Sequence, residues 1–384
     1  MTDALAMKAT HFHFHFQWSP DSPPRGFRTG VSLHSHTLHS MESLDFIYKI
    51  AAQSPVLRWA LQRGESRYLA YHGVPLDLRR GWWTPPLAPL DAYNVEAGQI
   101  AGLDLAPIVS LTDHDDIEAP MSLQAVDATR DVPVSVEWTV PFGPTFFHLG
   151  LHNLPPRLAR ELMARLREFT AYPETTELHD ILQTLDATPG VLLVFNHPLW
   201  DEKGVGQEKH RQCVLEMLKK FGGFLHAIEI NGLRPWGENR EAIRLANAWQ
   251  KPVVAGGDRH ALEPNVVLNL TKASTFGAFV DEIRAGFSEV FITSHYRQSH
   301  SLRILHNIVD VLRPYENHGN GWREWPDRAF YRCEDGLVRS LRELWGDNHP
   351  GAVRVFDGLM RIAGNTSLRS AMRTASARGE QVVL

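Results

Sequence analysis

Short apolar runs alternate with helix-like segments along most of the chain. The apolar runs predict strands at residues 31–35, 107–112, 132–136, 146–151, 191–195, 227–230, 252–255 and 290–293. Amphipathic spacing predicts helices at residues 156–169, 176–185, 207–221, 238–250 and 276–286. Strands that are almost wholly apolar and separated by helices are typical of a mainly parallel sheet covered on both faces. We therefore expect an α/β fold, either a barrel or a doubly wound sheet.

Three segments depart from this alternation. Residues 11–16 alternate His and Phe, which predicts an edge strand with one histidine face; a second metal site there is the less favoured alternative. Residues 51–106 are long for a connection and are expected to overhang the strand ends as a lid or stacking wall, or equally to bury their tryptophans in a satellite subdomain. After Ser294 the pattern predicts helices at 302–312, 336–344, 353–362 and 368–377.

These patterns predict three regions. They are an N-terminal arm over residues 1–29, a central α/β unit over 30–298 that contains the 51–106 insertion, and a helical C-terminal extension over 299–384. The extension is expected to pack on the central unit or on a second subunit, so a homo-oligomer is one expectation.

The composition narrows the classes of function. The chain has 384 residues, 43% of them hydrophobic, and a net charge of -5, which argues against disorder and against binding of long nucleic acid. Cys213 and Cys333 lie far apart, so neither a disulfide framework nor a thiolate zinc site is expected. Since no basic and apolar leader and no 18-residue apolar run occurs, we expect a cytoplasmic protein without a membrane segment.

The composition also contains 20 histidines, and many of them fall at strand ends. Histidines and carboxylates occur at or just after nearly every predicted strand: His34, His36, Asp113, His114, Asp115, Glu137, His148, His197, Glu229, Asp258 and His260. In a parallel barrel these ends meet at one mouth, and buried ionisable groups need a partner or a metal ion. Singly, each motif has an ordinary structural explanation, but together they predict a centre with two or more metal ions.

Six ordered motifs in this set resemble those of the polymerase and histidinol phosphatase (PHP) superfamily. They are His34-Ser35-His36-Thr37, Thr112-Asp113-His114-Asp115, Val136-Glu137, Phe147-His148-Leu149, Asn196-His197-Pro198 and Gly257-Asp258-Arg259-His260. The resemblance covers about residues 30–295. It implies a distorted (β/α)7 TIM-like barrel that holds two or three metal ions at its C-terminal mouth and hydrolyses phosphate esters.

The resemblance also implies the ligand sets. His34, His36, Glu137 and Asp258 would hold one ion, Glu137 would bridge to a second held by His148 and His197, and His114 and His260 would hold a third. Family members often carry Asp at the position of Met41. Since a thioether cannot replace a carboxylate on a hard cation, either the adjacent Glu42 reaches the third ion or that site is weak or absent.

These ligands suit zinc, manganese or iron. A hydroxide bridging two ions is the expected nucleophile for in-line attack on phosphorus. We expect His197 or His260 to protonate the leaving oxygen, and count Asp258 with them as catalytic; Glu229 is expected to orient a ligand histidine. The candidate phosphate ligands are Arg234, Arg259, Arg79 and Arg80. The expected substrate is a small phosphorylated molecule, a nucleotide or a short oligonucleotide.

Two other functions remain open at this point. An amidohydrolase-like enzyme also begins with His-x-His on a barrel strand but cleaves C–N bonds. The second motif, with Asp113 and His114, and the pairing of Asp258 with His260 favour the phosphoesterase. A non-catalytic PHP-like binding module is the third alternative, and the nearly intact ligand set argues against it.

Overall fold

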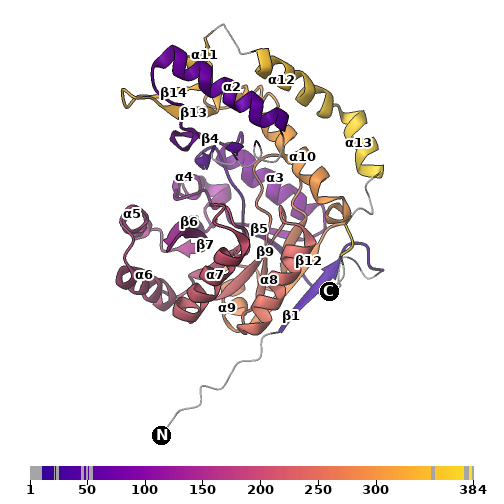
Figure 1. Cartoon of the computed structure of the whole chain (residues 1–384). Coiled ribbons are helices and arrows are strands. Elements are labelled where there is room, and N and C mark those ends of the chain that lie inside the picture. The colour runs from indigo at the N-terminus through magenta and orange to yellow at the C-terminus, as the bar shows by residue number, and fades with distance from the viewer. Residues whose placement is uncertain are drawn as a thin grey trace.

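The chain folds into a mixed α/β body with three sheets (Figure 1). The computed structural model describes residues 11–20, 22, 26–44, 47–48, 51, 55–346, 351–375 and 380–382. One five-stranded sheet has the order β1-β12-β11-β2-β5, a second has the order β10-β9-β8-β7-β6, and a four-stranded sheet has the order β14-β13-β4-β3.

The strands of the two large sheets carry most of the predicted site. The first sheet contains β1 (His11–Phe16), β2 (Thr29–Ser32), β5 (Ala106–Val109), β11 (Val267–Thr271) and β12 (Phe287–Ile292). The second contains β6 (Val134–Phe142), β7 (Thr145–Leu154), β8 (Leu192–Asn196), β9 (Ala227–Asn231) and β10 (Val253–Gly256). Two isolated parallel bridges connect the two large sheets. One joins Ser35, after β2, to Arg259, after β10, and the other joins His114, after β5, to Glu137 in β6. These contacts bring the strand ends to one place.

The pairing is mixed, so the expectation of a mainly parallel arrangement is wrong. Among the described residues the two large sheets hold four parallel and four antiparallel strand pairs. β6 and β7 form a hairpin because Gly143, at φ 57°, and Pro144 connect them directly and leave no room for a crossover helix. The described strands lie in separate sheets rather than in one hydrogen-bonded ring, and the (β/α)7 barrel stays a prediction.

Helices cover the outer faces of these sheets. They are α3 (Pro89–Ala101), α4 (Glu118–Gln124), α5 (Ala159–Ala171), α6 (Thr175–Ala187), α7 (Gln207–Phe221), α8 (Trp236–Ala248) and α9 (Phe276–Arg284). α7 has the predicted bounds because Val214, Met217 and Leu218 recur at helical spacing and are buried. The core beneath these helices includes Trp138, fully buried, whose Nε1 donates to Thr170 Oγ1 at 3.0 Å.

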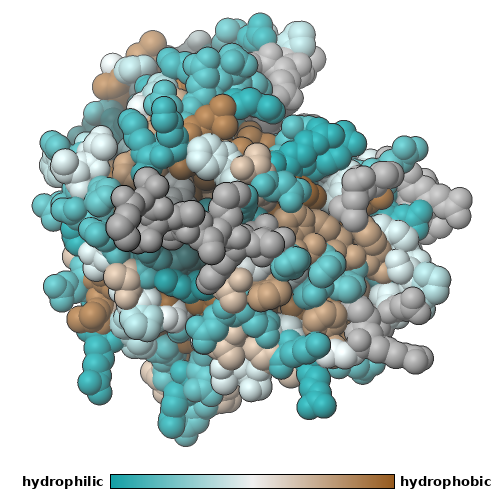
Figure 2. All heavy atoms as spheres, turned by 90° about the horizontal axis from the view of Figure 1, so that it is seen from below, coloured by the Kyte–Doolittle hydropathy of each residue, from teal (hydrophilic) through white to brown (hydrophobic). Residues whose placement is uncertain are grey.

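The N-terminal arm forms the predicted edge strand. β1 pairs in parallel with β12 at the end of its sheet. The rings of His13 and His15 lie 3.2 and 2.7 Å from the carboxylate of Glu289, while the phenylalanines of β1 pack against the main core. Within the described part of the chain, no helix combines the length and the apolar character that crossing a membrane needs. The face seen from below mixes hydrophilic and hydrophobic side chains (Figure 2), as is usual for a folded chain.

The third sheet joins the insertion to the C-terminal extension. β3 (Glu42–Ser43) pairs with β4 (Gly81–Trp83), and β4 pairs with β13 (Ala329–Arg332), which pairs with β14 (Val338–Ser340). The remaining helices are α2 (Pro55–His72), α10 (His300–Leu312), α11 (Leu341–Trp345), α12 (Gly351–Ala363) and α13 (Thr366–Ala375). The helix predicted over 336–344 is wrong in its first half, because β14 continues the hairpin from β13. The last two residues of the helix predicted over 368–377 lie outside the described residues.

Candidate metal centre

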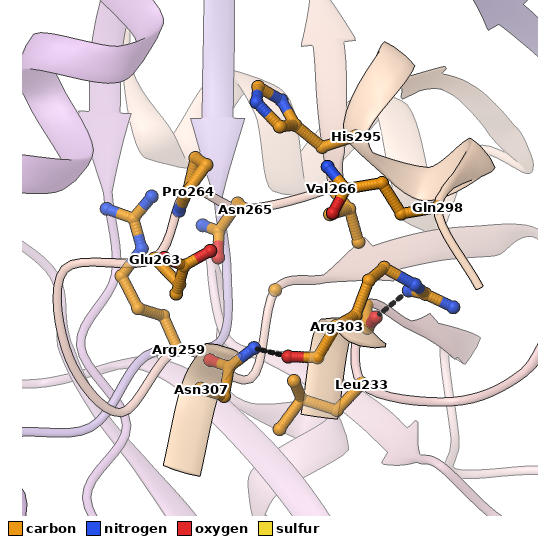
Figure 3. A pocket seen from close by; sticks show the side chains of 12 residues that line it. Leu233, Arg259, Glu263, Pro264, Asn265, Val266, His295, Gln298, Arg303 and Asn307 are labelled. Atoms are coloured by element: carbon orange, nitrogen blue, oxygen red, sulfur yellow. Dashed lines mark hydrogen bonds between the residues drawn. The ribbon is translucent and has the colours of Figure 1, made fainter. Parts of the chain in front are cut away.

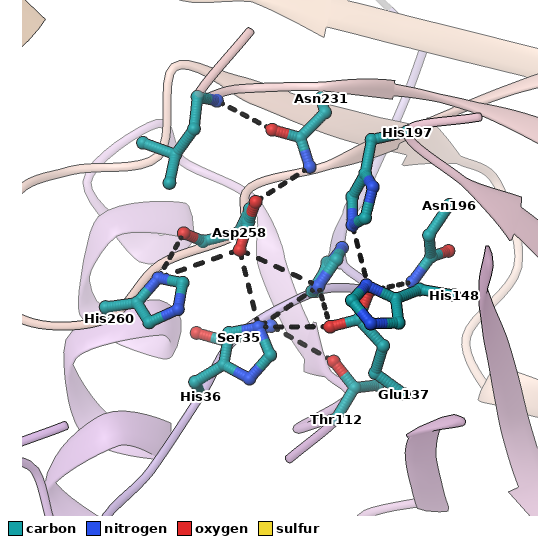
Figure 4. Close-up of polar contacts among 12 residues, drawn as sticks. Ser35, His36, Thr112, Glu137, His148, Asn196, His197, Asn231, Asp258 and His260 are labelled. Carbon is teal, nitrogen blue, oxygen red and sulfur yellow. Dashed lines mark hydrogen bonds and ion pairs between the residues drawn. The ribbon is translucent and has the colours of Figure 1, made fainter. Parts of the chain in front are cut away.

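The structure brings all nine predicted ligands into one largely buried cluster. Figure 4 shows part of this cluster, with His36, Glu137, His148, His197, Asp258 and His260 labelled. The ligands form overlapping groups of three in which the donor atoms lie within 4.8 Å of one another; their members are His34, His36, Glu42, His114, Glu137, His148, His197, Asp258 and His260, together with Glu229. Six members follow the carboxyl ends of β2, β5, β8 and β10, namely His34, His36, His114, His197, Asp258 and His260. The other four lie within strands: Glu42 in β3, Glu137 in β6, His148 in β7 and Glu229 in β9. Imidazole nitrogens and carboxylate oxygens are the donors that zinc, manganese and iron accept, so the residues fit such ions.

Glu137 lies at the centre of the cluster with its side chain 1% exposed. Its Oε2 lies 2.9 Å from His34 Nε2 and 3.4 Å from His114 Nδ1. Its Oε1 lies 3.0 Å from His197 Nε2 and 3.5 Å from His148 Nδ1. His36 Nε2 also lies 3.4 Å from Oε2. Because the two oxygens face different imidazoles, this carboxylate has the position that a bridge between two metal ions requires.

The structure shows where Glu42 lies, the residue next to Met41 whose part in the third metal position the sequence left open. The Met41 side chain is exposed, while Glu42 Oε2 lies 3.4 Å from His114 Nε2 and Glu42 Oε1 lies 3.3 Å from His260 Nε2. Burial alone would raise the pKa of Glu42, but His114 and His260 outweigh it and hold the pKa well below its usual value. Glu42, and not Met41, therefore lies beside the two histidines that are expected to hold the third ion.

A second set of polar groups orients the ligands. His34 Nδ1 donates to Glu229 Oε1 at 2.6 Å, which leaves His34 Nε2 turned toward the cluster. Glu229 Oε2 accepts from the backbone N–H of His197 at 2.9 Å. The Nδ2 of Asn231 donates to Asp258 Oδ2 at 3.0 Å and so fixes that carboxylate. Sequence reasoning foresaw the role of Glu229 but missed Asn231, whose only signal was its place at the end of β9.

Burial and neighbouring charges set the protonation of the histidines. Burial, reinforced by His260, lowers the pKa of His36 to about 4, so its ring is neutral at pH 7 and has a lone pair to offer. Burial also lowers the pKa of His34, but Glu137 and Glu229 outweigh it and raise that pKa well above the usual value. Of these two carboxylates, Glu137 is the one that a metal ion would share with His34, whereas Glu229 orients the ring through Nδ1.

Two residues of the cluster have strained backbones. Asp258 has φ 55° and His197 has φ 25°, in the left-handed region that costs a non-glycine residue about 1 kcal/mol or more. Backbone bonds hold the first of these turns, because the Asp258 N–H donates to the His34 carbonyl at 2.8 Å and the His36 N–H donates to the Arg259 carbonyl at 2.8 Å. The first and last motifs are thus tied together by main chain.

Glu202 is a further acidic residue that sequence reasoning missed. Its Oε2 lies 3.8 Å from His148 Nδ1, and it lines a small pocket with Phe146, His197 and Trp200. Burial raises the pKa of Glu202 to about 7. Its signal in the sequence was only its position five residues after His197.

Only one of the four candidate arginines lies at the rim of the cluster. The Arg234 guanidinium stacks 4.2 Å from the centre of the Trp200 ring, and that ring packs against His197 at 5.3 Å. Arg80 binds Glu334 and the carbonyl of Cys333, and the largely exposed Arg79 pairs with Asp77. The structure does not bring Arg79 and Arg80 to the cluster.

Arg259 points away from the cluster as well. Its side chain is buried, and its Nε lies 3.4 Å from the carboxylate of Glu96 on α3. It lines a separate pocket with Glu263 and Arg303 (Figure 3). The structure therefore places this side chain in an internal ion pair and does not bring it to the cluster.

Comparison with known proteins identifies no family for this chain. Neither a family model nor a curated protein matches the sequence. Among solved structures, an amidohydrolase from Chromobacterium violaceum is similar at 16% identity with a TM-score of 0.34, covering 48% of this chain and 86% of its own. PsfC from Pseudomonas syringae is similar at 14% identity with a TM-score of 0.38, covering 56% and 87%. A proposed metal-dependent phosphoesterase from Bifidobacterium adolescentis is similar at 15% identity with a TM-score of 0.32, covering 52% and 91%. At these TM-scores the likenesses carry no argument about function.

Proposed function

We propose that this chain is a metal-dependent phosphoesterase on a distorted (β/α)7 barrel, with two or three divalent ions of zinc, manganese or iron held by the cluster. The observation that carries the proposal is the position of Glu137, whose two oxygens face different imidazoles of the cluster. Asp258 and Glu42 supply further carboxylates at the flanks. Bound there, such ions would provide an activated water and would stabilise the charge of the phosphoryl oxygens.

The residues of the chain would bind and protonate the substrate. Arg234, fixed against Trp200, presents a cation at the rim, which favours an anionic phosphate ester over the neutral amide that a C–N hydrolase would cleave. His197 or His260 would donate a proton to the leaving oxygen, with Asp258 held in place by Asn231. The substrate class is a small phosphorylated molecule, a nucleotide or a short oligonucleotide.

The test combines metal analysis with product detection. Protein loaded with manganese or zinc should bind at least two ions and release inorganic phosphate from a panel of phosphate esters, and Glu137→Gln should lose both properties. Ammonia release from amides or cyclic ureas, without phosphate release, would instead identify the C–N hydrolase. Metal binding without any hydrolysis would identify a binding module.

A further inference from the structure

The C-terminal extension reaches the metal centre through the third sheet. On the basis of the metal centre proposed above, we propose that this extension positions Glu42, and so assembles the metal position that Glu42 forms with His36 and His114, beside His260. Residues beyond 320 would then act on that position without contacting an ion. The third sheet and α2 lie together at the top of Figure 1, above α3 and α4.

Glu42 depends on β4 for its place. β3 has two residues, Glu42 and Ser43, and lies at the end of the sheet, where Glu42 is paired in register with Trp83. A two-residue strand cannot hold its own position, because even a longer isolated hairpin is only marginally stable in water. Ser40 Oγ adds a hydrogen bond of 2.8 Å to Glu42 Oε1. The direction of this carboxylate therefore follows the position of β4.

β4 is in turn held by the extension. Trp83 and Trp82 pair with Ala329 and Phe330 of β13, and the N–H of Thr84 donates to the carbonyl of Arg328 at 2.9 Å. The fit is close, because a Cβ added to Gly81 would lie 2.8 Å from Leu44 Cδ1 and 3.3 Å from the carbonyl oxygen of Phe330. β4 therefore has the extension on one side and the strand that carries Glu42 on the other.

Arg328 anchors the start of β13. It is 1% exposed, and its guanidinium donates to four main-chain carbonyls, those of Val311, Arg313, Trp322 and Arg323. Removing this side chain would leave buried carbonyls without donors, which is costlier than losing an exposed contact. Arg328 thus joins β13 to the end of α10 and to the loop that follows it, and through β13 it holds β4.

The same strand places an aromatic ring beside the cluster. The Trp83 ring lies 5.7 Å from the His260 ring, whose Nε2 is 3.3 Å from Glu42. Glu42 and Trp83 are paired residues on adjacent strands, so a shift of β4 would move both. One displacement would therefore disturb the carboxylate and the packing of His260 together.

The test compares two arginines of the extension. Arg328→Met removes the anchor, whereas Arg339→Met removes an arginine of β14 that pairs with the exposed Asp335. Metal content and affinity would be measured on the full chain by mass spectrometry after dialysis against graded Mn2+, with far-UV circular dichroism to check folding. We expect Arg328→Met and Glu42→Gln to weaken one ion by about 10-fold or more and to leave the others bound, and Arg339→Met to behave as wild type.

The outcomes separate this proposal from the proposed function. If folded Arg328→Met retains every ion at wild-type affinity while Glu42→Gln loses one, the positioning role is overturned and the metal centre stands. If the wild-type chain binds no Mn2+, Zn2+ or Fe2+, the metal centre fails and the positioning role with it. A uniform loss of all ions by Arg328→Met also overturns the positioning role. If Arg328→Met does not fold, Gly81→Ala, which adds one methyl group between Leu44 and β13, is measured in its place against the same expectations.

Discussion

Met41 and Glu42 face opposite sides of the chain: the Met41 side chain is 53% exposed, whereas the Glu42 carboxylate lies between His114 and His260. Met41, which departs from the PHP motifs that this sequence resembles, is therefore outside the cluster, and its neighbour Glu42 supplies a carboxylate there. A shift of one residue reverses the direction of a side chain in extended backbone, so the two positions are not interchangeable.

A carboxylate at position 41 should not replace the carboxylate of Glu42 in the cluster. We expect Met41→Asp alone to leave metal content unchanged, because the new side chain would face solvent. Glu42→Gln should weaken one ion by about 10-fold or more, and the double variant Met41→Asp/Glu42→Gln should show the same loss. Equilibrium dialysis with metal analysis measures this. Recovery in the double variant would show that position 41 can reach the cluster.

Glu229 should control metal affinity through His34. A Cβ added at Gly256 would lie 1.5 Å from Glu229 Oε1, so Gly256→Ala must displace that carboxylate from His34. We expect metal affinity to fall about 10- to 100-fold in Gly256→Ala, as for other partners of metal-bound histidines. Competition with a chelating dye measures the affinity.

Two variants serve as references for this prediction. Gly237→Ala adds the same methyl group where nothing lies within 4 Å, and it should bind metal as the wild type does. Glu229→Gln keeps the shape of the side chain but removes its charge, and it should weaken affinity by about 10-fold. Wild-type affinity in a folded Gly256→Ala variant would show that the contact of Glu229 with His34 does not tune the site.

Arg259 should matter for stability rather than for substrate binding. Arg259→Met leaves Glu96 buried without its cation, and breaking a buried pair in this way typically costs about 3 to 5 kcal/mol. The double variant Glu96→Gln/Arg259→Met should recover part of the free energy of unfolding, because it leaves no unpaired charge. Urea unfolding of the single and double variants measures this. If the double variant loses as much free energy of unfolding as the two single variants together, Arg259 and Glu96 do not form a stabilising ion pair.

Arg234, in contrast, should matter for substrate binding rather than for stability. Arg234→Met gives up a stacking contact with Trp200 worth about 1 kcal/mol, so its unfolding midpoint should stay near that of the wild type. We expect KM for a phosphate ester to rise about 10-fold as the rim loses its cation, with kcat less affected. Steady-state kinetics on the metal-loaded protein measures both constants, and an unchanged KM would remove Arg234 from substrate binding.

The contrast between these arginines shows what the sequence could predict. The cluster of candidate ligands was predictable in part because alternate residues at a strand end share a face, as His34 and His36 do. The direction of Arg259 was not predictable, because Asp258 before it has a left-handed backbone and its partner Glu96 lies on a helix far away in sequence. The pairing of β4 with β13 was equally hard to predict, because its paired residues, such as Trp82 and Phe330, are far apart in sequence and leave no local pattern.

His152 should make the fold sensitive to acid. Its ring is 1% exposed, its Nδ1 lies 2.9 Å from Ser110 Oγ, and burial, reinforced by His34, lowers its pKa to about 3. An unfolded histidine has a pKa of about 6.5. Between these two pKa values the unfolded chain binds more protons at this ring than the folded chain does, so the free energy of unfolding rises with pH. The contribution of His152 to stability is fully present above pH 6.5 and is lost as the pH falls toward 3.

Replacing this ring should flatten the pH dependence of stability. His152→Gln should be less stable than wild type at pH 7, since it gives up a buried contact with Ser110 and leaves a gap. Between pH 4.5 and 6 its free energy of unfolding should change less steeply, by up to about 1.4 kcal/mol per pH unit. Urea unfolding in EDTA across this range measures the slope without protons released by metal binding. His179→Gln, at a half-exposed ring, is the control, and equal slopes for His152→Gln and wild type would show that His152 does not stay neutral in the folded chain.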